Sequence, residues 1–131
     1  MFRLTGSLLN LLYFFHNPYR VCRRFLQKRG DVDIYQYGET PLKTVHKLCI
    51  EADVTSKDHL FELGAGRGKT AFYIRETFGC DVTAIEQIPL FVKKARQLNK
   101  FLSSLLTTKI PFGWILLINF KKVFLMSAKF L

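Results

Sequence analysis

The sequence predicts an α/β fold in which helices cover a parallel sheet. Two short apolar segments with strand-like patterns, 59–63 and 81–86, alternate with helical patterns over 69–78 and after residue 88. This alternation is typical of a β-α-β unit with a right-handed crossover. The chain has 131 residues, enough for one hydrophobic core and too few for a second domain. Its 49% hydrophobic content and 13 Phe exclude an intrinsically disordered chain.

Helices are expected before this β-α-β core. Residues 7–29 form one or two helices broken at Asn17-Pro18, because proline disfavours the helical conformation of the residue before it. Gly30 ends this region, and a loop follows over 31–38.

The helices around the two strands have their own start and stop signals. Thr40 is a suitable N-cap, and Pro41 is preorganised for the first helical position. The apolar side chains of this helix recur at helical spacing and are Leu42, Val45, Leu48, Cys49 and Ala52. Gly79 ends the helix over 69–78. Ile88-Pro89 opens another helix, whose apolar positions Phe91, Ala95, Leu98 and Leu102 lie on one side.

A glycine-rich turn, LGAGRG, joins the first strand to its helix. Its glycines occupy alternate positions, Gly64, Gly66 and Gly68, with Ala65 after the first. Residues without a side chain let the chain turn sharply and bring bare backbone against a ligand at the N-terminus of the next helix. We therefore expect a ligand at this turn.

Spacing separates the ligand classes for the turn. A nucleotide-binding P-loop needs four residues between its first glycine and its Gly-Lys-Thr ending. Here the first glycine would have to stand at position 63, which is Leu63, so the spacing does not match. The dinucleotide fingerprint places its third glycine inside the helix, where this chain has Lys69. A nucleoside triphosphate, a dinucleotide and a tight connection without any ligand are the weaker alternatives. Arg67 and Lys69 are expected to face solvent.

Two carboxylates complete the pattern E-x-G-x-G-x-G. Glu62 lies at the carboxyl end of the first strand, where it can accept hydrogen bonds from an ammonium group. Glu86 lies at the end of the second strand, where it can bind both hydroxyls of a ribose. A ligand with an amino-acid head and a ribose but no phosphate fits these groups, and S-adenosylmethionine is such a ligand.

The segment ELGAGRG resembles the first motif of the class I (Rossmann-like) S-adenosylmethionine-dependent methyltransferases, and AIE resembles the acidic end of their second strand. YGET, over 37–40, resembles the substrate-side loop of the non-SET histone-lysine methyltransferases of the disruptor-of-telomeric-silencing type. The resemblance covers about residues 35–102. Motif and resemblance together give the expected cofactor-binding residues as Tyr37, Glu39, Thr40, Glu62, Gly64, Ala65, Gly66, Gly68 and Glu86.

The resemblance implies an incomplete Rossmann-like parallel sheet and an enzyme that transfers a methyl group from S-adenosyl-L-methionine. In that family YGET lies over the methionine part of the cofactor. No catalytic residue is assigned, because alignment of the reactants supplies most of the rate in such a displacement. The methyl acceptor is unknown, and protein lysine follows by analogy alone.

The sequence departs from the family after Glu86, where it has no Asp or Glu for the adenine side of the site. We therefore expect a truncated or frameshifted methyltransferase with an N-terminal helical segment over 1–34, a cofactor-binding core over 35–102 and an apolar basic tail over 103–131. Within the tail, 114–120 is expected to form a buried strand. A non-catalytic remnant is the alternative.

The net charge of +10 is concentrated at the two ends of the chain and suggests an anionic surface or nucleic acid as a partner. Apolar runs over 8–15 and 110–120 are shorter than the roughly 20 residues that cross a bilayer. No transmembrane helix is expected, although a basic protein bound at a membrane surface is a second alternative function. Without a signal-peptide cleavage site, a cytoplasmic location is expected.

The cysteines and histidines suggest no special chemistry. The three cysteines at positions 22, 49 and 80 form no C-x-x-C pair, so they are expected to be reduced, buried thiols with no metal site. His16, His46 and His59 have no evident partner and are expected to be structural or solvated.

Overall fold

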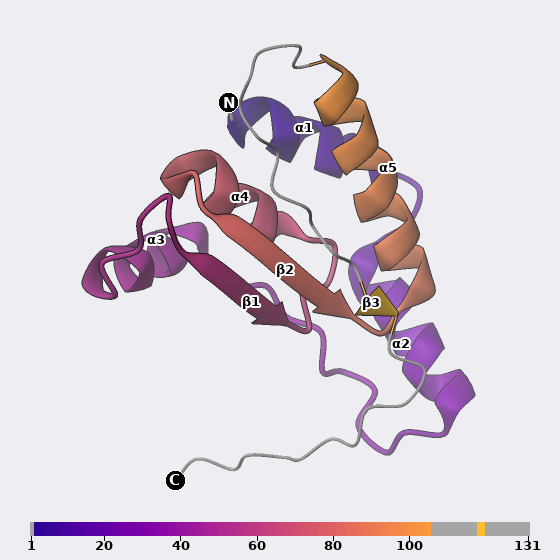
Figure 1. Cartoon of the computed structure of the whole chain (residues 1–131). Coiled ribbons are helices and arrows are strands. Elements are labelled where there is room, and N and C mark those ends of the chain that lie inside the picture. The colour runs from indigo at the N-terminus through magenta and orange to yellow at the C-terminus, as the bar shows by residue number, and fades with distance from the viewer. Residues whose placement is uncertain (1, 106–117, 120–131) are drawn as a thin grey trace, which may run out of the picture.

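A computed structural model describes residues 2–105 and 118–119 and has a mixed α/β architecture (Figure 1). Strands and helices alternate from β1 to α5, as the sequence predicts. In chain order the elements are α1 (Phe2–Leu12), α2 (Pro18–Arg29), α3 (Leu42–Glu51), β1 (His59–Leu63), α4 (Lys69–Phe78), β2 (Asp81–Glu86), α5 (Pro89–Leu105) and β3 (Ile118–Asn119).

The strands form a parallel sheet in the order β1-β2-β3. In the register of β1 against β2, His59 lies opposite Asp81 and Leu63 lies opposite Ile85. Ile85 in turn pairs with Ile118 of β3. Because the strands are parallel, the carboxyl ends of β1 and β2 meet at one edge of the sheet, where the glycine turn begins.

The hydrophobic core lies on one side of this sheet. Val82 and Ala84 of β2 are fully buried there. The predicted apolar side of α5 is confirmed, since Phe91, Ala95, Leu98 and Leu102 are all at most 2% exposed. On the other side of the sheet, Phe61 and Leu63 are 68% and 78% exposed. The described helices therefore cover the side to which Glu62 also points.

Several predicted helix ends are confirmed. Gly30 and Gly79 follow α2 and α4 with φ of 84° and 73°, a left-handed conformation that glycine adopts without steric cost. The break at Asn17-Pro18 separates α1 from α2. Asn17 caps α2, since its side-chain oxygen accepts hydrogen bonds from the backbone N–H groups of Tyr19 and Arg20.

The third helix begins later than expected. Pro41 is the N-cap with φ −57° and ψ 133°, and its carbonyl accepts hydrogen bonds from Thr44 N and Val45 N. No side chain caps this end, so the prediction of Thr40 as N-cap is wrong. Because Pro41 keeps extended backbone angles, Leu42 is the first helical residue.

The apolar side of α3 is narrower than its sequence suggests. Val45 and Cys49 are buried, as expected. Leu48 is 58% exposed and Ala52 is also exposed, so these two apolar residues lie away from the buried side. In the structure α3 contacts mainly α4, and one helix covers only a narrow stripe of its neighbour.

The cysteines are free and buried, as expected. The histidines have polar neighbours that the sequence does not reveal. His59 Nε2 lies 2.7 Å from Thr83 Oγ1, His46 Nδ1 lies 2.9 Å from Tyr73 Oη, and His16 Nδ1 lies 3.4 Å from Lys94 Nζ.

Two expectations concern the tail and the membrane. Within the strand expected over 114–120, only 118–119 is described, and it forms β3; the rest lies outside the described residues. Of the helices in the described part of the chain, none combines the length and the hydrophobicity that crossing a bilayer requires.

The end of α1 is attached to α5. The Lys94 ammonium donates a hydrogen bond to the carbonyl of Leu12, one of the carbonyls that has no partner inside α1. Burial lowers the pKa of Lys94. Nearby, the rings of Tyr13 and Phe91 meet edge-on at 5.8 Å. These contacts bind the N-terminal helices to the β-α-β core.

Replacing Phe91 by alanine tests this core. The ring is 0% exposed, so we expect Phe91→Ala to lower the free energy of unfolding by about 3–5 kcal/mol. The control is Phe15→Ala, because Phe15 is 89% exposed and should change stability by less than about 0.5 kcal/mol. Urea denaturation measures both values. Equal effects of the two substitutions would contradict this packing.

Candidate functional site

The glycine turn between β1 and α4 crosses the carboxyl end of β2. The backbone N–H groups of Gly64 and Ala65 both donate to the carbonyl of Ile85, at 2.8 and 3.0 Å. Gly66 and Gly68 have φ of 56° and 82°, which glycine adopts far more readily than other residues. The turn therefore has the sharp, side-chain-free form that the sequence predicts.

Tyr37 packs directly on this turn. A Cβ atom added to Gly66 would lie 3.1 Å from Tyr37 Cε2, so the ring would have to shift to accommodate a side chain. The Tyr37 ring also contacts Phe91 of α5 and Tyr19 of α2, with ring centroids 5.6 and 4.9 Å apart. Tyr37 therefore connects the loop before α3, the glycine turn and two helices.

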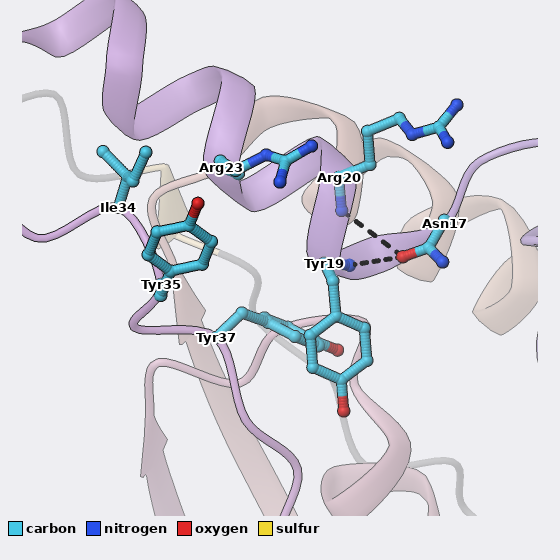
Figure 2. Close-up of a pocket in the computed structure, with 7 residues that line it drawn as sticks. All are labelled: Asn17, Tyr19, Arg20, Arg23, Ile34, Tyr35 and Tyr37. Carbon is cyan, nitrogen blue, oxygen red and sulfur yellow. Dashed lines mark hydrogen bonds between the residues drawn. The ribbon is translucent and has the colours of Figure 1, made fainter.

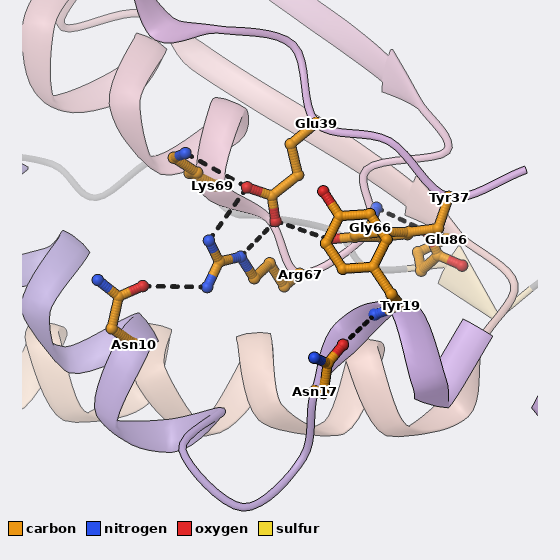
Figure 3. A network of polar contacts seen from close by, with 9 residues as sticks. All are labelled: Asn10, Asn17, Tyr19, Tyr37, Glu39, Gly66, Arg67, Lys69 and Glu86. Atoms are coloured by element: carbon orange, nitrogen blue, oxygen red, sulfur yellow. Dashed lines mark hydrogen bonds and ion pairs between the residues drawn. The ribbon is translucent and has the colours of Figure 1, made fainter. Parts of the chain in front are cut away.

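Glu39 is the centre of a polar network at the same place (Figure 3). Its carboxylate accepts hydrogen bonds from Tyr37 Oη at 2.7 Å, from Arg67 Nε at 2.5 Å and from Lys69 Nζ at 3.3 Å. Arg67 also donates to Asn10 Oδ1 of α1. Burial alone would raise the pKa of Glu39, but the hydrogen bonds from Arg67 and Tyr37 outweigh it and lower that pKa.

The expectation that Arg67 and Lys69 face solvent is wrong. Their side chains are 13% and 31% exposed, and both form ion pairs with Glu39. The Glu39 side chain is also mostly buried, with 19% of it exposed. Arg67 and Lys69 are 28 and 30 residues from Glu39 in the chain, so no local spacing in the sequence predicts these ion pairs.

These residues surround a cavity of about 250 Å³. The lining residues are Tyr37, Gly38, Glu39, Thr40, Glu62, Leu63, Gly64, Ala65, Gly66, Arg67, Lys69 and Thr70. The structure thus brings together every site residue predicted from the sequence except Gly68 and Glu86. Gly68 instead caps α4, with its backbone against the ring of Phe72.

Glu62 lines the cavity with a carboxylate that lacks a full set of partners. Its Oε2 atom is buried and has no hydrogen-bond partner among the described residues. The pKa of Glu62 is raised to about 7. Burial is the largest cause and the charge of Glu86 adds to it, against hydrogen bonds from the Thr70 side chain and the Ala71 backbone. A buried acceptor without a partner is costly, so this atom favours a ligand that donates hydrogen bonds or carries positive charge.

Glu86 is 5% exposed and lies next to the glycine turn rather than on the cavity wall. Its Oε2 accepts a hydrogen bond from Gly66 N at 2.7 Å, and its Oε1 accepts one from Ile88 N at 2.8 Å. Burial raises the pKa of Glu86, against backbone hydrogen bonds from Ile88, Gly66 and Gln87. The two carboxylates share one side of the sheet, because Glu62 pairs with Ala84, two residues before Glu86.

A second cavity, of about 290 Å³, adjoins the first (Figure 2). Tyr37 lines both cavities. The remaining lining residues are Asn17, Tyr19, Arg20, Arg23, Ile34 and Tyr35. The guanidinium carbon of Arg23 lies 6.0 Å from the centre of the Tyr35 ring. The sequence did not predict this cavity, whose signal is the tyrosine and arginines of α2 together with Tyr35 and Tyr37 in the loop over 31–38.

Comparison of the chain with protein-family models, with curated proteins and with solved structures finds no match. The fold and the site define the class: an α/β protein with a parallel sheet and a cavity outside the carboxyl ends of its strands, the position at which open α/β sheets bind ligands. Within residues 2–105 and 118–119, no group of three or more potential metal ligands occurs.

The contact between Gly66 and Tyr37 can be tested with two alanine substitutions. We expect Gly66→Ala to lower the free energy of unfolding by about 1–2 kcal/mol, because its φ is 56° and the new Cβ would press on Tyr37. Gly38→Ala, at the same cavity, is the control, since nothing lies within 4 Å of its added Cβ. Chemical denaturation gives both values. A neutral Gly66→Ala would contradict the contact.

Glu62 should make stability depend on pH. Its pKa is about 7 in the folded protein against 4.5 for an unperturbed carboxyl. Below pH 4.5 it is protonated in both states, and between pH 4.5 and 7 only the unfolded chain releases the proton. Stability from this group is therefore lost as pH rises, by about 3 kcal/mol in total. We expect Glu62→Gln to remove this loss.

The measurement is urea denaturation of the original chain and of Glu62→Gln at pH 5 and pH 8. Other titrating groups cancel when the two pH differences are subtracted. The matched control is Glu51→Gln, an exposed carboxylate at the end of α3, for which the pH difference should stay unchanged. If Glu62→Gln keeps the full pH difference of the original chain, Glu62 is not a buried carboxyl with a raised pKa.

Proposed function

We propose that this chain is a Rossmann-like, class I S-adenosylmethionine-dependent methyltransferase. The observation that carries the proposal is Oε2 of Glu62, a buried acceptor without a hydrogen-bond partner among the described residues, beside a side-chain-free turn. An ammonium group supplies both the hydrogen bonds and the charge that this atom lacks. The α-amino group of the methionine part of the cofactor is such a group.

The charge of the cavity supports a zwitterionic ligand head. Glu62 is one pole of the cavity, and Arg67 and Lys69 are cations in its wall that also pair with Glu39. The α-carboxylate of an amino acid would lie near these cations and near the N-terminus of α4, which favours anions. A triphosphate would instead bring negative charge against Glu62. The cavity therefore supports an amino-acid head over a nucleotide phosphate chain.

The size of the cavity limits what enters it. Its volume of about 250 Å³ is below the roughly 300–1,000 Å³ typical of sites for whole ligands of drug size. We infer that it takes the amino-acid end of the cofactor. The second cavity shares Tyr37 as its wall, but Glu86, the residue proposed for the ribose, does not line it.

The proposal keeps the ribose contact of Glu86, although this carboxylate already accepts hydrogen bonds from the backbone. Backbone N–H groups of Gly66, Ile88 and Gln87 already bind this carboxylate. A carboxylate has about four lone-pair sites, so little acceptor capacity remains for the ribose hydroxyls. A ribose bound at Glu86 would have to share or displace one of these hydrogen bonds.

When bound, the cofactor would supply a methyl group on a sulfonium, an electrophile for the acceptor. The residues of this chain position the reactants and exclude water. Tyr37 and Glu39 cover the glycine turn, and Arg67 keeps Glu39 in place. Protein lysine is the acceptor that the resemblance suggests, and it stays a proposal for mass spectrometry of methylated peptides.

Calorimetric titration with S-adenosylhomocysteine tests the cofactor site. We expect binding by the original chain, at least about tenfold weaker binding by Glu62→Gln, and no change for Glu51→Gln, since a hydrogen bond to a charged group contributes about 1.5–3 kcal/mol. Binding should strengthen from pH 6 to pH 8, because the pKa of Glu62 is about 7 and its charged form binds the ammonium.

Three outcomes decide against the proposal. Heat with ATP and none with S-adenosylhomocysteine would favour the nucleotide alternative. No heat with either ligand would favour a non-catalytic remnant. Binding that Glu62→Gln leaves unchanged at both pH values would remove the observation on which the proposal depends.

A further inference from the structure

Helix α1 and the turn after it are apolar on two sides. Their inward side chains, Thr5, Leu9 and Tyr13, are at most 4% exposed and account for packing on the core. A second set of apolar side chains points outward. Leu4 and Leu11 are 49% and 71% exposed, and Phe14 and Phe15 in the following turn are 75% and 89% exposed. Among the described residues, nothing covers this second set.

The two aromatic residues in the turn are the most conspicuous members of this set. Their rings contact each other edge-on, with centroids 4.9 Å apart. Burying a phenylalanine side chain is strongly favourable, so two neighbouring exposed rings indicate a surface that is covered when the protein functions. An exposed apolar patch by itself does not specify what covers it.

The charge of the neighbouring helices indicates what covers this apolar patch. Residues 1–30 and 87–105 contain no Asp or Glu. Exposed cations lie on α2 and α5, the two helices that follow and flank α1 (Figure 1). Four of them are Arg24, Lys28, Lys93 and Lys100. All ten acidic residues of the chain lie between 31 and 86.

We propose that this basic helical face, made of Leu4, Leu11, Phe14, Phe15, Arg24, Lys28, Lys93 and Lys100, binds the surface of an anionic lipid bilayer. Exposed aromatic and leucine side chains enter the boundary between headgroups and acyl chains, and cations are attracted to anionic headgroups. Helix α1 has 11 residues and is too short to span the bilayer. The protein would therefore lie on the membrane surface.

The observations favour a bilayer over nucleic acid. Phosphate groups would pair with the cations, but a duplex in water offers no apolar layer for Phe14 and Phe15. Aromatic rings can stack on unpaired bases, yet the outward leucines, Leu4 and Leu11, gain nothing from stacking. This proposal is independent of the cofactor proposal, since none of the eight residues lines the cavity at the glycine turn.

Co-sedimentation of the full chain with vesicles tests the proposal. One set of vesicles is phosphatidylcholine alone, and in the other phosphatidylserine replaces a third of it. We expect binding to the second set only, and weaker binding at high salt. The double variant Phe14→Ser/Phe15→Ser should bind at least about tenfold more weakly, and Arg24→Gln/Lys28→Gln should bind more weakly with a smaller salt dependence.

Matched controls make the same chemical changes elsewhere. Leu48→Ser/Ile50→Ser removes two apolar side chains of α3 that are 58% and 57% exposed. Lys43→Gln/Lys57→Gln removes two exposed cations from α3 and from the loop before β1. Both controls should bind vesicles like the original chain. If either control loses as much binding as its counterpart, the attraction is not localised to the basic helical face and the proposal is overturned.

Two further measurements exclude the other occupants. Thermal unfolding of Phe14→Ser/Phe15→Ser should match that of the original chain; a fall as large as that caused by Phe91→Ala would mean that another part of this protein covers the rings, which overturns the proposal. Titration with a duplex oligonucleotide should show weaker binding than anionic vesicles. Tight duplex binding that the phenylalanine variant retains would identify nucleic acid as the partner.

Discussion

The hydrogen bond between the backbone of Gly66 and the carboxylate of Glu86 is the interaction on which the site depends. It connects the turn after β1 to the end of β2, and the Ile85 carbonyl supports it with two further hydrogen bonds. With the turn fixed, Tyr37 can pack on the bare Cα of Gly66, and Tyr37 in turn donates to Glu39. A side chain at position 66 would push the Tyr37 ring away from the turn.

The carboxylates of Glu39, Glu62 and Glu86 are buried or half-buried close together and would repel one another. Each has different partners in the fold. Glu39 is balanced by Arg67 and Lys69, and Glu86 by backbone N–H groups. Of these three, only Glu62 keeps an acceptor atom without a partner among the described residues, and burial raises its pKa to about 7. Perturbed titration beside a cavity is typical of a functional site, although structural ion pairs also perturb pKa values.

The molecule separates its charges in space. Its acidic residues belong to the segment that carries the cavity, while α1, α2 and α5 carry cations and exposed apolar side chains without any Asp or Glu. Lys94 and Tyr13 hold the basic part together, because they bind the end of α1 to α5. If the protein binds a membrane through its basic helical face, the cavity at the sheet edge remains a separate site.

Local patterns in the sequence determined the strands over 59–63 and 81–86 and the helix over 69–78, because strand periodicity, helical periodicity and the terminal Gly79 act over a few neighbouring residues. They also determined the glycine turn. Only the tertiary structure decided the ion pairs of Glu39 with Arg67 and Lys69 and the hydrogen bond of Glu86 with Gly66. Those interactions join residues 20 to 30 positions apart, and such distances close only when the whole chain packs.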